Sequence, residues 1–418
     1  MDTELQLPRY RLQRARELQG WSRKEVAERI GTTSLNVLRW EQGLTRPGSY
    51  FRGQLCSLFG KSPSELDLTS SDPAGGAPVY DPAIPVPAAH QLVGRDMELR
   101  KFKEQLCDAD HAASIVLQGL PGVGKTALAI ALANDQELQA YFRDGVLWAS
   151  LGPEPDMPTL FHRWGTLLGL SAPEMALLHD NDSWFKALYL ATRTRRMLFV
   201  IDDAWHAEEV LLCTIGGEHC AYLVTTRFPL LAAELSLDRV IPVKELGEDE
   251  GMILLRMLAP KVVGYQQQAH ALVRAVGGLP LALILMGDYL RDRAYSGQSR
   301  HVEAALKHLF TMRGRLQISM TREFPQRHTG LTAGTLSSLK LTLALTIERL
   351  DEQARSALRA LAAFPPKPDS FTEEDALAAG CTLETLDGLF DAGLLESSDR
   401  ARYTLHPVIT DYARTFLV

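Results

Sequence analysis

The chain has 418 residues, of which 46% are hydrophobic and 23% charged, and its formal net charge is −7. This composition is ordinary for a soluble globular protein, and the length is enough for about three domains. The longest apolar run, Leu279–Met286, is far too short to span a bilayer, and the start MDTELQLPRY has no apolar core. We therefore expect neither a membrane segment nor a signal peptide.

Cysteine usage and charge distribution further limit the class of protein. The cysteines are odd in number and form no CxxC pair: Cys56, Cys107, Cys213, Cys220 and Cys381. This argues against zinc and a disulfide framework and fits a reducing cytoplasm. Residues 1–66 contain 11 Lys and Arg against 7 Asp and Glu, a net charge of +4, which leaves −11 for the remainder. A basic N-terminal piece is a mild indication of nucleic-acid binding by that piece.

Residues 1–66 are predicted to be a domain of short helices with tight turns. Ser22-Arg-Lys-Glu25 is a capping box, which opens a helix that Gly31 ends, and Thr33 caps the next helix. Residues 67–90 are rich in Pro, Gly, Ala and Ser without an apolar period, which predicts a flexible linker.

From residue 91 the pattern changes to strands that alternate with helices. Near-continuous apolar runs predict strands buried on both faces, and hence an α/β domain with a parallel sheet over 91–245. The predicted strands are 113–118, 144–151, 197–202 and 221–225.

The last third is predicted to be mainly helical. Residues 246–334 form a helical domain and a connector: 246–310 are helical, and 311–334 are polar and irregular. Residues 335–418 are predicted to be a winged-helix domain with a hairpin after its helices. Those helices are 335–363, 372–380 and 382–392.

A phosphate-binding loop occupies Gly119–Thr126, with the sequence GLPGVGKT. It follows a predicted strand and opens a helix, which is the context that this motif requires. Its backbone N–H groups and the helix N-terminus would hold phosphate oxygens, Lys125 would reach the β- and γ-phosphates, and Thr126 would bind Mg²⁺. The predicted nucleotide contacts are Gly122, Val123, Gly124, Lys125, Thr126 and Ala127.

Two further strand ends carry the rest of the predicted site. MLFVIDDAW ends in two carboxylates, of which Asp202 would hold Mg²⁺ through water and Asp203 would orient or deprotonate the attacking water. Arg227, in Thr225-Thr-Arg227, is placed to contact the γ-phosphate and so to distinguish ATP from ADP. Lys125, Asp202, Asp203 and Arg227 are thus the predicted catalytic residues.

Several stretches, in order and at matching spacing, resemble the NB-ARC module of STAND-class signalling ATPases. They are LVGRDMEL, GLPGVGKTALA, DGVLWASLG, LFVIDDAW, LVTTR, VKELGEDEG, GGLPLAL and YTLHPVITDYA, which together span about 92–418. The resemblance implies that Val93 and Arg95 lie near the adenine and ribose, and that Pro280 packs on the base. It also implies that His406 contacts the β-phosphate of ADP.

Two features limit what the resemblance implies. The family's Met-His-Asp reads Leu405-His406-Pro407 here, so only the histidine contact carries over. A lone histidine after a strand is otherwise a structural residue. Family members usually carry sensor repeats after the winged helix, whereas this sequence stops at Val418, so sensing falls to a missing C-terminal domain or to a partner.

Residues 9–66 resemble a phage-repressor-type (XRE) helix-turn-helix, through WSRKEVAERIGTTSLNVLRWEQGLTRP. The predicted core residues are Val26, Ala27, Ile30, Val37 and Trp40. The second helix would enter the DNA major groove. The outward polar candidates for base contact are Ser34, Asn36 and Arg39. The alternative is a helical module that binds protein.

The combined prediction is a cytoplasmic ADP/ATP switch. It would be closed with ADP and open and self-associating with ATP and Mg²⁺, with slow hydrolysis as its reset and output through the DNA-binding head. Two alternatives stay open: a P-loop ATPase that does work on nucleic acid, and an NLR-like defence or assembly scaffold whose N-terminal domain binds protein.

Overall fold

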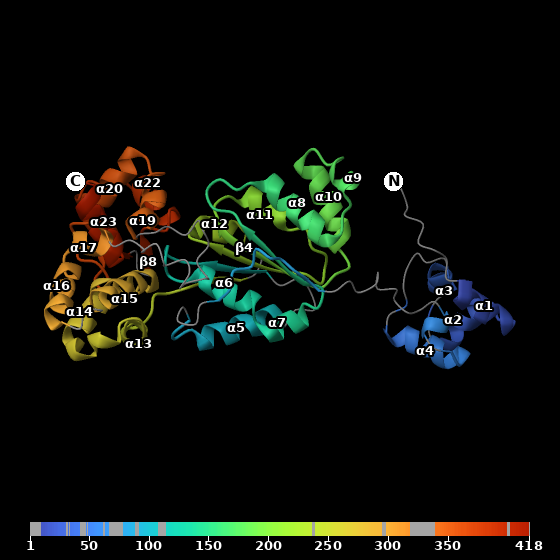
Figure 1. The fold of residues 1–418 in the computed structure, drawn as a ribbon. Helices are drawn as coiled ribbons and strands as arrows, with labels where there is room; N and C mark the ends of the chain where they lie inside the picture. The colour runs from blue at the N-terminus through green and yellow to red at the C-terminus, as the bar shows by residue number, and fades with distance from the viewer. Residues whose placement is uncertain are drawn as a thin grey trace. The chain divides into compact units, whose positions relative to one another are not determined.

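The computed structural model describes residues 10–30, 32, 34–41, 47, 49–61, 63–66, 78–87, 92–107, 114–235, 239–294, 298–317, 339–398 and 402–417. The chain divides into two compact units, Met1–Ala77 and Pro78–Val418 (Figure 1). None of the helices in the described residues is both long and apolar enough to cross a membrane.

The described part of the first unit consists of short helices: α1 (Tyr10–Leu18), α2 (Arg23–Ile30), α3 (Ser34–Glu41), α4 (Ser49–Phe59) and the 3-10 helix η1 (Pro63–Leu66). The predicted capping box is confirmed, because the N–H of Glu25 donates to Ser22 Oγ at 3.2 Å and the N–H of Ser22 donates to Glu25 Oε2 at 2.6 Å. The predicted core is confirmed too, since all five of its residues are buried. Gly31 and Thr33 lie outside the described residues.

The second unit is built on a six-stranded parallel sheet of order β1-β3-β4-β5-β2-β6 in the residues that the structure describes. The strands are β1 (Val79–Tyr80), β2 (Ser114–Gln118), β3 (Gly145–Ser150), β4 (Met197–Ala204), β5 (Ala221–Thr226) and β6 (Val240–Pro242). The four predicted strands are confirmed. Because all neighbouring pairs are parallel, the C-terminal ends of β2, β4 and β5 share one edge of the sheet.

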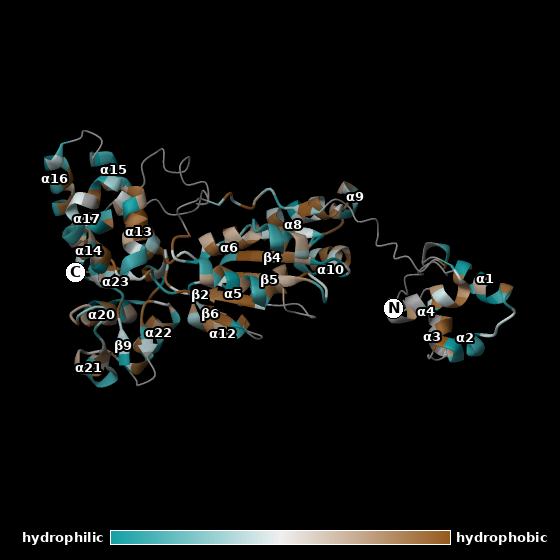
Figure 2. Ribbon diagram, turned by 90° about the horizontal axis from the view of Figure 1, so that it is seen from below, coloured by the Kyte–Doolittle hydropathy of each residue, from teal (hydrophilic) through white to brown (hydrophobic). Residues whose placement is uncertain are grey.

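Helices cover both faces of this sheet (Figure 1). Alternate residues such as Ile115 and Val116 enter two separate apolar cores, one on each face. One face carries α5 (Asp96–Cys107), α6 (Lys125–Ala133) and α7 (Gln136–Tyr141). The other carries α8 (Met157–Leu168), α9 (Ala172–Met175), α10 (Asn181–Thr192), α11 (Ala207–Cys213) and α12 (Pro229–Leu235). Burial on both faces explains the continuous apolar runs, which colour β4 and β5 brown in Figure 2.

The predicted linker 67–90 needs a correction in its second half. Residues 78–87 are described, and their strand β1 pairs with β3 in parallel. Asp81, whose side chain is fully buried, accepts hydrogen bonds from the backbone N–H of Trp148 at 3.2 Å and from Trp164 Nε1 at 3.1 Å. The carboxylate thus anchors a segment whose proline-rich composition carries no strand signal.

Helices follow the sheet, as predicted for 246–310. They are α13 (Glu248–Leu258), η2 (Pro260–Tyr265), α14 (Gln266–Ala275), α15 (Pro280–Ala294), α16 (Ser299–Leu309) and α17 (Met312–Gln317). The prediction of an irregular segment from 311 is wrong for α17. Arg315 stabilises this short helix, because its Nε donates to Asp411 Oδ2 at 3.0 Å and its Nη1 donates to the Phe310 carbonyl at 3.1 Å.

The C-terminal part combines helices with a small antiparallel sheet of order β7-β9-β8. Its elements are α19 (Leu339–Ile347), α20 (Glu352–Leu361), β7 (Phe371–Thr372), α21 (Glu373–Ala378), α22 (Leu383–Asp391), β8 (Glu396–Ser398), β9 (Arg402–Thr404) and α23 (Pro407–Phe416). The hairpin and the helices predicted over 372–380 and 382–392 are confirmed. The range 335–363 holds two helices, α19 and α20, which a turn separates, and its residues 335–338 lie outside the described residues. Neither β7 nor α23 was predicted.

Candidate nucleotide-binding site

The loop Gly119–Thr126 joins β2 to α6, as its motif predicted. Gly124, at the N-cap of α6, has a φ of 104° and offers no side chain to cap the helix, so the first N–H groups of α6 have no cap from it. An added Cβ on Gly124 would meet no atom within 4 Å. The loop therefore leaves space in front of backbone donors, which fits a phosphate group.

Lys125 is buried inside this loop. Its Nζ donates to the carbonyl oxygens of Gly119 at 2.8 Å and of Leu120 at 3.0 Å. Burial and the nearby Arg227 cation lower the pKa of Lys125 to about 7, and the Asp203 and Asp202 carboxylates offset this only in part. Burial thus disfavours the charged ammonium, and an anion such as a polyphosphate bound at the loop would stabilise that charged form.

Asp202 lies beside the loop at the end of β4. Its Oδ1 accepts hydrogen bonds from Thr126 Oγ1 at 2.9 Å and from Thr225 Oγ1 at 2.7 Å. Burial raises the pKa of Asp202 to about 6, against the effect of these two hydrogen bonds. The hydroxyl and the carboxylate are oxygen ligands of the kind that Mg²⁺ takes next to a phosphate, so the predicted metal pair is brought together.

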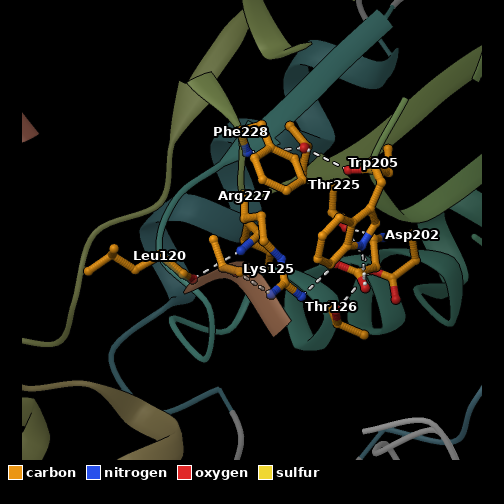
Figure 3. A network of polar contacts seen from close by, with 12 residues as sticks. Leu120, Lys125, Thr126, Asp202, Trp205, Thr225, Arg227 and Phe228 are labelled. Atoms are coloured by element: carbon orange, nitrogen blue, oxygen red, sulfur yellow. Dashed lines mark hydrogen bonds and ion pairs between the residues drawn. The ribbon is translucent and has the colours of Figure 1, made fainter. Parts of the chain in front are cut away.

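Asp203 and Arg227 form an ion pair at the neighbouring strand ends. Figure 3 shows Arg227 of this pair together with Lys125 and Trp205. Arg227 Nη2 donates to Asp203 Oδ1 at 3.0 Å, and Trp205 Nε1 donates to Asp203 Oδ2 at 3.1 Å. Asp203 has a φ of 52°, which is unusual for a residue other than glycine. Arg227 also donates through Nη1 to Thr346 Oγ1 of α19 at 3.1 Å. Asp203 and Arg227, two of the four predicted catalytic residues, are thus in contact, and the C-terminal part contacts Arg227.

Arg95 contacts the loop from its other side. Its Nη2 donates to the carbonyl oxygens of Val123 at 3.2 Å and of Lys244 at 2.6 Å, and its Nη1 donates to Glu98 Oε1 at 2.7 Å. The guanidinium therefore supports the backbone of the phosphate loop. Val93 packs on the same apolar core as α5 and α6.

The start of α15 meets the phosphate loop directly. The N–H of Leu281 donates to the carbonyl of Gly122 at 3.1 Å, and Pro280 is the first residue of that helix. A Cβ on Gly122 would lie 2.8 Å from Leu281 Cβ, so only glycine allows this approach. The helical segment is in this way joined to the loop that would hold the phosphates.

His406 lies at the N-cap of α23, where its Nδ1 accepts the N–H of Val408 at 3.2 Å. Burial, and then the charge of Lys367, lower the pKa of His406 to about 4, so the imidazole is neutral near pH 7. With Nδ1 as acceptor, Nε2 carries the proton. Nε2 is buried without a hydrogen-bond partner among the described residues, and a Cβ on Gly277 would lie 2.7 Å from it.

The C-terminal end of α22 packs against the exit of β5. Gly393 has a φ of 67°, and a Cβ there would lie 2.3 Å from the carbonyl oxygen of Arg227. Gly380, which follows α21, has a φ of 94°, but a Cβ there would meet nothing within 4 Å. The two glycines share a left-handed backbone and differ in their surroundings.

We expect Gly393→Ala to lower the free energy of unfolding by at least 1 kcal/mol more than Gly380→Ala. Both substitutions cost about 1–2 kcal/mol for a left-handed residue with a Cβ, but only Gly393→Ala must also displace the Arg227 backbone. Urea denaturation of both variants measures the difference. Equal losses would show that the α22 contact contributes nothing to stability.

The DNA-contact candidates lie in the first unit. Ser34 opens α3 and is exposed. The side chains of Asn36 and Arg39 lie outside the described residues, so their assignment stays a prediction.

Sequence reasoning missed three residues of the nucleotide site: Thr225, Trp205 and Thr346. Thr225 and Trp205 lie inside motifs that the sequence analysis recognised but were given no role there, whereas Thr346 has no local signal.

A phosphate loop after a central parallel strand, with two carboxylates two strands away, defines a P-loop NTPase fold. Comparison with protein families agrees: residues 95–262 match the NB-ARC domain, and residues 12–66 match a helix-turn-helix. The chain thus contains an NB-ARC domain that follows an N-terminal helix-turn-helix domain.

Similar proteins include regulators and disease resistance proteins. The regulatory protein AfsR of Streptomyces griseus is 26% identical over 374 residues, which cover 85% of this chain and 35% of the relative. A probable disease resistance protein of Arabidopsis thaliana is 28% identical over 283 residues, 65% of this chain and 30% of the relative. The chain spans about a third of the length of these relatives.

A solved structure of a STAND protein with a tetratricopeptide repeat sensor, from Pyrococcus horikoshii, is similar to 79% of this chain. The similar part is 44% of the solved chain, with 19% sequence identity and a TM-score of 0.36.

Proposed function

We propose that the chain is a STAND-type nucleotide switch that is closed with ADP and opens and self-associates with ATP. The observation that carries the proposal is that three parts of the second unit meet at one phosphate loop and its strand ends. The loop itself contacts α15 through Gly122 and Leu281, and Arg227 contacts α19 through Thr346. A nucleotide held there contacts groups whose positions depend on the neighbouring parts.

The proposed assignment of roles follows the contacts above. Lys125 and the α6 N-terminus hold the phosphates, Thr126 and Asp202 hold Mg²⁺, and Asp203 orients water. Mg²⁺ held by Thr126 and Asp202 would supply positive charge against the phosphate oxygens. Arg227 contacts the γ-phosphate and so distinguishes ATP from ADP. Slow hydrolysis of ATP returns the chain to the closed ADP state. Val93, Arg95 and Pro280 border the adenosine side, where Arg95 acts by supporting the loop.

The C-terminal part supplies His406, which we propose as the latch: a side chain that holds the closed state by contacting bound ADP. We assign 335–418 to a winged-helix domain that follows a helical domain and connector (246–334) and the nucleotide domain (91–245). His406 presents a buried Nε2–H that makes no hydrogen bond within the described residues; it lies next to Gly277, three residues before Pro280, and 4.0 Å from Glu245 Oε1. In the proposed closed state this donor binds a phosphate oxygen of ADP.

The energy of such a switch is attainable. A ligand shifts an equilibrium only by its differential affinity for the two states, and a shift from 1:99 to 99:1 needs about 5.5 kcal/mol. Hydrogen bonds to charged groups contribute roughly 1.5–3 kcal/mol each. State-dependent contacts from Lys125, Arg227 and His406 can supply that difference.

A direct test is the state of the full chain with each nucleotide. We expect a monomer with ADP and a larger assembly with ATP and Mg²⁺, measured by light scattering after gel filtration. An identical mass with both nucleotides would contradict the switch. Rapid ATP turnover stimulated by DNA would favour instead an ATPase that works on nucleic acid.

The proposed output is DNA binding by the helix-turn-helix, with Ser34, Asn36 and Arg39 toward the bases. We expect a fragment of residues 1–77, which form a separate compact unit, to bind duplex DNA with an affinity that falls as salt rises. Fluorescence anisotropy measures it. Arg39→Ala should weaken binding more than Lys24→Ala, which removes the same charge from an exposed side chain of α2.

The full chain adds a second measurement. Assembly with ATP should tighten DNA binding, because several heads then engage one duplex. An absence of DNA affinity at low salt, for fragment and full chain alike, would favour the alternative of a scaffold whose N-terminal domain binds protein.

A further inference from the structure

The indole of Trp205 lies between the C-terminal part of the second unit and two proposed catalytic residues, Asp203 and Arg227, which are called the catalytic pair. It follows β4 directly and is 5% exposed. Its Nε1–H binds Asp203 Oδ2 at 3.1 Å, and the Arg227 guanidinium carbon lies 4.6 Å from the ring centroid. The guanidinium carbon of Arg349 lies 4.3 Å from the same centroid. One side chain therefore contacts Asp203, Arg227 and a residue from beyond α19.

Arg349 stands in the turn that follows α19, two residues after that helix ends. It also donates through Nη2 to the Pro153 carbonyl at 3.4 Å, and its own side chain is otherwise exposed. Thr346, one helical turn earlier, binds Arg227. Two residues of one segment therefore reach the catalytic pair, Thr346 directly and Arg349 through the indole.

We propose that Trp205 is a positioning residue that transmits the position of the α19 segment to Asp203 and Arg227. With Arg349 on its ring, the indole is held so that its N–H fixes the Asp203 carboxylate and its face retains Arg227 on that carboxylate. When the α19 segment moves away, the ring loses Arg349 and Arg227 loses Thr346. Arg227 is then released toward the nucleotide. This inference rests on the proposed switch. It names Trp205 as the residue that links α19 and the turn after it to the strand ends that carry Asp203 and Arg227.

Chemistry and geometry support this role over simple packing. A tryptophan that only filled space would need neither a hydrogen bond from its N–H nor cations on its ring, and leucine or phenylalanine would replace it. Here the polar edge of the indole holds a carboxylate and its faces carry two guanidinium groups, which is the arrangement that cation–π attraction favours. Only tryptophan among the apolar residues offers both.

The test is a set of variants in the full chain, with the release rate of fluorescent ADP as the main measurement. Arg349→Ala should speed ADP release about two- to fivefold, the effect of losing one exposed cation–π contact. Arg349→Lys, which keeps a cation over the ring, should restore the slow rate. In a Trp205→Leu background Arg349→Ala should have no further effect, because the indole that transmits it is gone.

Trp205→Phe separates the contact of the ring with Arg349 from the hydrogen bond that the indole N–H donates to Asp203. It keeps a ring for Arg349 and removes the N–H that holds Asp203, so ATP hydrolysis should fall about tenfold while ATP affinity is unchanged. Arg196→Ala is the matched control, since Arg196 lies 4.8 Å from the Tyr141 ring in the same unit and away from the site. It should leave ADP release unchanged.

Two results would overturn the proposal. One is an ADP release rate that Arg349→Ala does not alter. The other is an effect of Arg349→Ala that stays the same in the Trp205→Leu background, since coupling would then run through Pro153 or Thr346. A wild-type chain that binds neither ADP nor ATP would overturn the switch itself, and this inference with it. Measuring the binding of both nucleotides by every variant distinguishes a failure of the Trp205 inference from a failure of the proposed switch.

Discussion

Lys125→Ala is expected to weaken ATP binding by about 100-fold or more. The ammonium of Lys125 is the buried cation of the phosphate loop, and the loop backbone alone cannot neutralise a triphosphate. Loss of two charge-assisted hydrogen bonds at roughly 1.5–3 kcal/mol each corresponds to at least that factor. Isothermal calorimetry with ATP and Mg²⁺ measures the change.

The fold should survive this substitution. Lys125 is a buried cation whose charge is not fully balanced, so its removal should not lower the melting temperature without nucleotide. Lys103→Ala is the matched control: it removes the same charge from α5, where Lys103 pairs with Asp135 and Glu137 at the surface, and it should bind ATP normally. Unchanged ATP affinity of Lys125→Ala would refute the site. Asp203→Ala, in contrast, should bind ATP and fail to hydrolyse it.

His406→Ala should release ADP about 5- to 150-fold faster and should assemble at a lower ATP concentration. These factors correspond to the loss of one hydrogen bond of roughly 1–3 kcal/mol from the closed ADP state alone. At pH 7.5 the imidazole is neutral, because burial lowers its pKa to about 4, so a single Nε2–H donor is at stake. Stopped-flow release of fluorescent ADP and light scattering give the two measurements.

His406 also caps the N-terminus of α23, and this second role needs its own control variant. Its Nδ1 caps α23 through the N–H of Val408, and loss of such a cap costs about 1 kcal/mol of stability. His406→Asn keeps an acceptor at the cap and removes the Nε2–H. It should therefore restore most of the melting temperature and still release ADP quickly. If His406→Asn instead restores slow ADP release as well, the histidine is only a cap, and the latch is wrong.

Local sequence determined the central strands of the sheet and the phosphate loop of the site. Strands buried on both faces are continuous apolar runs, so β2, β3, β4 and β5 could be predicted. The loop from Gly119 to Thr126 is contiguous, and its chemistry depends on glycines and a lysine at fixed spacing, so it needs no tertiary information. The same holds for the capping box at Ser22 and Glu25, whose two hydrogen bonds lie within one helical turn.

Tertiary structure decided which distant groups complete the site. Thr346 is 119 residues from Arg227, and the Lys244 carbonyl is 149 residues from the Arg95 side chain that binds it. No periodicity or spacing marks such pairs, because what selects them is the approach of two surfaces after folding. Strand β1 is a similar case. Two residues among prolines carry no strand signal, and they join the sheet because β3 offers them an open edge and Asp81 finds buried donors there.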